Sequence, residues 1–121
     1  MYISNVGDSR AILVSESSDG RLVTRPLSAD QTPYRKDERE RCKKYGARIL
    51  TMDQLDGTKP NKECDWGNLQ LGEEIDEGGD PPRIWHQTLS APGTAFTRSF
   101  GDAFAEALGV TAEPEILELY V

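Results

Sequence analysis

Two glycine–aspartate pairs lie far apart in the sequence, each where a predicted regular element begins or ends. These pairs are Gly7-Asp8 and Gly101-Asp102. Glycine followed by aspartate is common in turns between strands and at helix starts, so each pair alone is most simply a structural turn. The backbone at such a junction nevertheless aims the carboxylate, and two aimed carboxylates can share a hard cation. Together the pairs raise the hypothesis of a metal site.

The first pair lies between two segments with strand character. Residues 2–6 and 11–14 are predicted to form a hairpin that Gly7-Asp8-Ser9 closes. A second turn signal at residues 17–20 precedes a third predicted strand at 22–27. The opening third of the chain is therefore predicted to be an antiparallel meander.

A charged segment in the middle of the chain is predicted to form a helix over residues 33–45. Thr32 is its predicted N-cap, and Pro33 falls in the first turn, where its missing N–H has no cost. Gly46 suits the left-handed position that ends a helix. Further predicted elements are strands at 48–51, 83–85 and 115–121, a turn at 92–93, and a helix at 95–108 that contains the second aspartate.

The net charge of −7 is concentrated in one part of the chain. Nine acidic residues and two lysines lie between Asp53 and Asp80, whereas acidic and basic residues are equal in number elsewhere. Residues 53–82 are also rich in glycine and proline without a sustained period, which predicts a long loop or a small irregular subdomain. No basic stripe is available for a nucleic-acid backbone, so a nucleic-acid partner is not expected.

Composition and chain ends suggest an intracellular protein of which this chain is a part. Cys42 and Cys64 lack the spacing of a disulfide framework or a zinc site, which favours reduced thiols in the cytoplasm or nucleus. No apolar run approaches the roughly 18 residues of a membrane span, so no membrane partner is expected. With predicted strands at both ends of its 121 residues, the chain is expected to be a piece of a larger domain.

Five segments resemble, in the same order, motifs of the metal-dependent serine/threonine protein phosphatases of type 2C. They are Asn5-Val6-Gly7-Asp8-Ser9-Arg10-Ala11, Leu27-Ser28-Ala29-Asp30-Gln31-Thr32-Pro33, Glu38-Arg39-Glu40-Arg41, Thr97-Arg98-Ser99-Phe100-Gly101-Asp102 and Ala112-Glu113-Pro114-Glu115-Ile116. Residues 79–85 and 92–99 look most like the branch fused to cyclic-nucleotide-binding and kinase domains. Gln31 stands where many members have histidine, and Ala47 where many have a second glycine.

The resemblance implies an α+β fold, a partial four-layer α-β-β-α sandwich of antiparallel sheets. Residues 1–121 would form the central part of one phosphatase catalytic domain, with an irregular acidic flap-like insertion at about residues 53–82. Asp102 matches an aspartate that binds a catalytic metal, and Asp8 matches one that helps to hold an additional metal. Arg98 is read either as orienting a neighbouring carboxylate or, more simply, as half of a structural ion pair.

The implied activity is hydrolysis of phosphoserine and phosphothreonine in protein substrates by a metal-activated water. Carboxylate ligands suit Mn²⁺ or Mg²⁺, and water bound between two such ions loses a proton more readily. Other family motifs, including the Asp-Gly-His-Gly-Gly turn, have no counterpart in the chain, so activity of this piece alone is doubtful. The alternative is a phosphatase-like module that has lost its chemistry and serves in binding or regulation.

Overall fold

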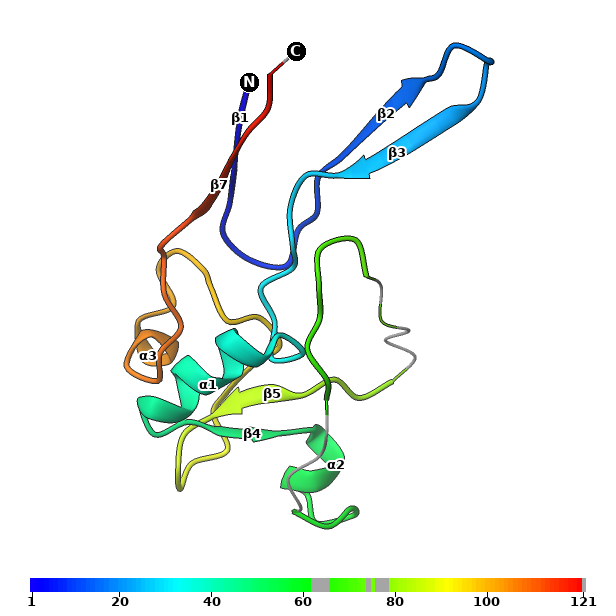
Figure 1. The fold of residues 1–121 in the computed structure, drawn as a ribbon. Helices are drawn as coiled ribbons and strands as arrows, with labels where there is room; N and C mark the ends of the chain where they lie inside the picture. The colour runs from blue at the N-terminus through cyan, green and yellow to red at the C-terminus, as the bar shows by residue number, and fades with distance from the viewer. Residues whose placement is uncertain (62–65, 74, 76–78, 121) are drawn as a thin grey trace.

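The computed structural model describes residues 1–61, 66–73, 75 and 79–120, which form short strands and helices. In chain order these are β1 (Tyr2–Asn5), β2 (Ile12–Glu16), β3 (Leu22–Pro26), α1 (Lys36–Lys44), β4 (Arg48–Leu50), α2 (Met52–Leu55), β5 (Arg83–Trp85), β6 (Pro92–Thr94), α3 (Ala103–Glu106) and β7 (Glu115–Glu118). The strands form three antiparallel sheets, ordered β1-β7, β2-β3 and β4-β5-β6 (Figure 1). The predicted α+β class with antiparallel sheets is confirmed.

The first and last strands of the chain pair with each other. In the β1-β7 ladder, Tyr2 lies opposite Glu118 and Asn5 opposite Glu115, so the two termini lie side by side (Figure 1). The predicted hairpin of residues 2–6 with 11–14 is therefore wrong, and so is the three-stranded meander. β2 pairs with β3 instead, as the second turn signal indicated.

The β1-β7 ladder and the β2-β3 hairpin extend away from the body of the molecule (Figure 1). Large apolar side chains on them are mostly exposed, including Ile12, Leu22 and Ile116 at 57%, 76% and 66%. The principal buried apolar cluster lies elsewhere, between α1, β4, β5 and the segment around α3.

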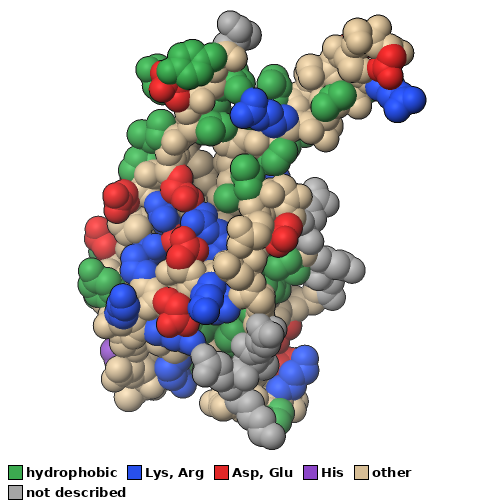
Figure 2. Space-filling view, viewed as in Figure 1, with side chains coloured by type: hydrophobic (Ala, Val, Ile, Leu, Met, Phe, Trp, Pro, Cys, Tyr) green, Lys and Arg blue, Asp and Glu red, His purple; other side chains and the backbone are tan. Residues whose placement is uncertain are grey.

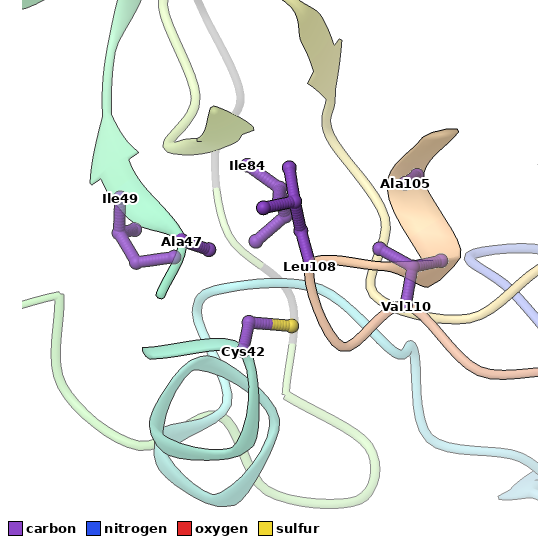
Figure 3. Packing of buried hydrophobic residues seen from close by; sticks show 7 residues of the cluster. All are labelled: Cys42, Ala47, Ile49, Ile84, Ala105, Leu108 and Val110. Atoms are coloured by element: carbon purple, nitrogen blue, oxygen red, sulfur yellow. The ribbon is translucent and has the colours of Figure 1, made fainter. Parts of the chain in front are cut away.

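This cluster contains buried side chains from four separate segments of the chain. Its members are Cys42, Ala47, Ile49, Ile84, Ala105, Leu108 and Val110 (Figure 3). Ile84, at the centre of the β4-β5-β6 sheet, is fully buried. Burial of this apolar surface holds α1 and the chain after α3 against the sheet.

The predicted helix at 33–45 exists, but it begins later than its sequence signals indicate. Arg35, not Thr32, is the N-cap of α1, and the N–H of Lys36 donates to Asn68 Oδ1 (3.2 Å). The Thr32 hydroxyl is buried without a hydrogen-bond partner among the described residues. At the other end, Gly46 has a φ of 89°, so the predicted left-handed position is confirmed.

The predicted helix at 95–108 is wrong over most of its length. Only α3 is helical, and residues 97–99 bond to other segments of the chain instead. Thr97 N–H donates to Gln31 O (2.9 Å), and Ser99 N–H donates to Thr111 O (3.0 Å). Residues 92–93, predicted as a turn, begin strand β6.

Within the predicted irregular segment 53–82, the structure adds one short helix. α2 begins at Met52 with a capping box, in which the Thr51 side chain accepts from Gln54 N–H and the Gln54 side chain accepts from Thr51 N–H. Residues 62–65, 74 and 76–78 lie outside the described part, which includes Cys64 and much of the expected acidic flap. No helix in the described ranges is long and apolar enough to cross a membrane.

Candidate metal centre

The turn that carries Asp8 is fixed through its backbone. Gly7 is buried with a φ of 116°, in the region that favours glycine. Its N–H donates to Gln31 Oε1 (2.6 Å), and its carbonyl accepts from Gln31 N–H (3.1 Å). The following residue, Asp8, is exposed. The Asp8 carboxylate is therefore exposed to solvent next to a backbone that two hydrogen bonds hold in place.

The segment that leads to Asp102 lies against this turn. A Cβ atom on Gly7 would be 3.6 Å from the carbonyl oxygen of Arg98. A surface hollow of about 320 Å³ is lined by residues 6–9, by Phe96 and by residues 98–100, so Asp8 is among its lining residues and Asp102 is not. Asp102 follows two residues later, exposed, as the N-cap residue of α3. Its carboxylate makes no capping hydrogen bond to that helix.

A buried carboxylate from α1 anchors the start of the Asp102 segment. The Glu38 side chain is 1% exposed and accepts hydrogen bonds from Arg98 Nε (2.9 Å) and Nη2 (3.0 Å). Arg41 approaches the same carboxylate through Nη1 (2.5 Å) and Nη2 (3.1 Å), and the Thr97 hydroxyl donates to it (2.8 Å). Arg98 thus forms a structural ion pair, the simpler of its two readings.

The electrostatics of this cluster favour the ionised form of Glu38. Burial alone would raise the pKa of the carboxyl group. Hydrogen bonds from Arg98, Arg41 and Thr97 outweigh that effect and lower the pKa to about 2. The cluster is therefore charged at neutral pH. On the surface around α1, acidic and basic side chains also alternate (Figure 2).

The donor types of this region suit a divalent metal, but the described residues do not form a complete ligand set. Asp8 and Asp102 offer carboxylate oxygens, which Mg²⁺ and Mn²⁺ prefer. In the part of the chain that the structure describes, no group of three or more His, Cys, Asp or Glu side chains could hold a metal ion. The assignment of Asp8 and Asp102 as metal ligands stays a prediction.

Sequence reasoning found the motif that contains Glu38 and Arg41 but not the more distant partners of Glu38. The spacing of Glu38 and Arg41 on one helix face signals an i, i+3 ion pair. The third member, Arg98, lies 60 residues away, and no local pattern joins it to Glu38. The bonds made by Gln31 were likewise missed.

Comparison with known proteins identifies the class. The chain belongs to the protein phosphatase 2C family, whose sequence model, described as "Protein phosphatase 2C", matches residues 1–121. The family resemblance carried by the five segments is confirmed. The sheets and helices are consistent with part of the four-layer α-β-β-α sandwich that the resemblance implied.

Similar proteins occur in plants. The chain is 53% identical over 116 residues to "Probable protein phosphatase 2C 35" of Arabidopsis thaliana, covering 96% of this chain and 32% of that protein. It is 34% identical to "Probable protein phosphatase 2C 64" of Oryza sativa subsp. japonica, covering 95% and 22%. The chain thus spans about a third or less of the length of these relatives. Both of these relatives are named as probable protein phosphatases. The expected fusion to cyclic-nucleotide-binding and kinase domains stays a prediction.

Proposed function

We propose that the full-length protein is a metal-dependent protein serine/threonine phosphatase and that residues 1–121 form the central part of its catalytic domain. The observation that carries this proposal is the match of the family's sequence model to residues 1–121, which include both glycine–aspartate pairs. Its substrates would be phosphoproteins, and it would work inside the cell, in the cytoplasm or nucleus.

This proposal gives a role to the two aspartates and to the residues that hold their backbone. Asp102 and Asp8 would hold Mn²⁺ or Mg²⁺, with further ligands from elsewhere in the full-length protein. The bound ions would supply a water activated for attack on phosphorus. Glu38 and Arg98 hold the backbone that leads to Asp102, and Gly7 fixes the turn that carries Asp8. The hollow beside Asp8 would admit part of the substrate.

Substitution of the proposed ligands tests this function in the full-length protein. With Mn²⁺ and a phosphopeptide, we expect Asp102→Ala to lower kcat/KM by about 100-fold or more, because a catalytic metal would lose a ligand. Asp8→Ala should mainly raise the Mn²⁺ concentration needed for half-maximal rate. Asp19→Ala, in the exposed β2-β3 turn, is the control and should leave both quantities unchanged.

Chelation supplies the complementary test. Treatment with EDTA should abolish phosphopeptide hydrolysis, and added Mn²⁺ should restore it. Full activity of Asp102→Ala would contradict the ligand assignment. A full-length protein that binds phosphopeptides without metal-dependent turnover would instead support the alternative, a binding or regulatory module.

A further inference from the structure

One buried residue bonds to both segments that carry the proposed metal ligands, through its side chain to one and through its backbone to both. Gln31 is fully buried in the segment before α1. Its side-chain oxygen accepts from Gly7 N–H (2.6 Å), next to Asp8. Its backbone carbonyl accepts from Thr97 N–H (2.9 Å), at the start of the segment that leads to Asp102. Its own N–H donates to Gly7 O (3.1 Å), so Gln31 bonds to both segments.

The other half of the Gln31 amide fixes its orientation. Its Nε2 donates to Asn5 O (3.2 Å) and to Glu115 Oε1 (3.0 Å). Glu115 is in turn held by Arg35, through Nη1 (2.6 Å) and Nη2 (3.2 Å). Both neighbours of Nε2 are acceptors, so only the NH₂ group can face them, and the amide oxygen must face Gly7.

The Gly7 turn needs this support because it has no partner strand. β1 runs into the turn paired with β7, and β2 leaves it paired with β3, so no β1-β2 ladder closes it. A buried N–H without an acceptor costs about 1–3 kcal/mol, which would favour opening of the turn. The Gln31 side chain supplies the acceptor that a ladder would otherwise supply.

We infer that Gln31 is a positioning residue, which holds the Asp8 turn and the segment leading to Asp102 in one fixed relation so that both can serve the metal centre. This inference rests on the proposed function for the role of the two aspartates. The physical basis is that groups which orient metal ligands typically affect metal affinity by about 10–100-fold.

The test compares Gln31→Met with Gln54→Met in the full-length protein. Gln54 is a matched control, because it is 4% exposed and its amide likewise accepts from a backbone N–H (Thr51, 2.9 Å) and donates to a backbone carbonyl (Pro60, 3.4 Å). By isothermal titration calorimetry, we expect Gln31→Met to weaken Mn²⁺ binding by about 10-fold or more. Gln54→Met should lose stability to a similar degree without a change in Mn²⁺ affinity.

A conservative variant separates the hydrogen bonds from the bulk of the side chain. The neutral imidazole of Gln31→His has one acceptor and one donor, so it can serve Gly7 and Glu115 together. We expect it to bind Mn²⁺ more tightly than Gln31→Met. Equal Mn²⁺ affinity in the wild type and Gln31→Met, or equal weakening in Gln31→Met and Gln54→Met, would overturn the inference.

Hydrogen exchange in the wild-type protein tests the same inference without relying on a variant that could fail to fold. Hydrogen–deuterium exchange resolved to single amides should show Gly7 and Thr97 protected together, and much more slowly exchanging than the exposed Ser9. If the Gly7 amide exchanges as fast as that of Ser9, the turn is not held and the inference fails. A wild type without metal-dependent activity would reject the proposed function, whereas an active wild type insensitive to Gln31→Met would reject only the role of Gln31.

Discussion

Glu38→Gln is expected to lower the free energy of unfolding of the full-length protein by about 3–5 kcal/mol. The substitution leaves two guanidinium groups without a carboxylate, and the Arg98 side chain is only 11% exposed. An unpaired buried charge is far more costly than the loss of an exposed ion pair. Since proteins are commonly stable by about 5–15 kcal/mol, the effect should be large in chemical denaturation of the metal-free protein.

Glu40→Gln is the matched control for this prediction. Glu40 lies on the same helix, its side chain is 50% exposed, and it pairs with Lys43 at 3.5 Å. Because an exposed pair contributes little, the free energy of unfolding should change by no more than about 0.5 kcal/mol. Similar losses in Glu38→Gln and Glu40→Gln would show that the buried cluster does not stabilise the fold.

The pH dependence of stability should identify the same carboxyl group. The pKa of Glu38 is lowered from 4.5 to about 2 in the folded protein, so its contribution is complete above its unfolded pKa. That contribution is lost as the pH falls through the folded pKa, which places the loss between about pH 5 and pH 2. Glu38→Gln should therefore show a shallower decline over this window. Hydrogen bonds from Arg35 also lower the pKa values of Glu115 and Asp37, so part of the decline should remain in Glu38→Gln.

Elements defined by local signals were predictable from the sequence. The β2-β3 hairpin has its turn residues between its strands, and the left-handed Gly46 follows the last turn of α1. The strands at residues 48–51 and 83–85 were predicted within one residue of β4 and β5. In each case the residues that determine the element lie within or directly beside it.

Elements defined by distant partners were not predictable in this way. Pairing of Asn5 with Glu115 joins the first and last strands, and the turn signal at Gly7 could not reveal it. Thr97 lies in a segment whose sequence predicts a helix. In the structure its N–H donates to the carbonyl of Gln31 and its hydroxyl donates to the carboxylate of Glu38. The two aspartates of the candidate site were proposed from their motifs, whereas the buried contacts of Gln31 and Glu38 beside them emerged only from the fold.

Gly109→Ala is expected to have the second large effect on stability. Gly109 has a φ of 91°, and a Cβ atom there would lie 2.9 Å from the Cα of Cys42 and 3.1 Å from Cδ2 of Tyr45. The first contact is with the backbone of α1, which cannot move without disturbing the buried cluster around Cys42. Overpacking of this kind typically costs about 1–3 kcal/mol, in addition to the strain of a left-handed alanine.

Gly57→Ala separates the two contributions, because Gly57 has a φ of 81° but no atom within 4 Å of an added Cβ. It should cost only the backbone strain, about 1–2 kcal/mol, and Gly109→Ala should cost at least about 1 kcal/mol more in the same denaturation experiment. Equal costs would mean that α1 can yield at Cys42.

The Gly109 carbonyl also accepts from Arg41 Nε (3.0 Å), and Arg41 Nη2 donates to Thr97 O (2.9 Å). A shift at Gly109 should therefore reach the segment that leads to Asp102 and lower the proposed phosphatase activity of the full-length protein, which Gly57→Ala should leave unchanged.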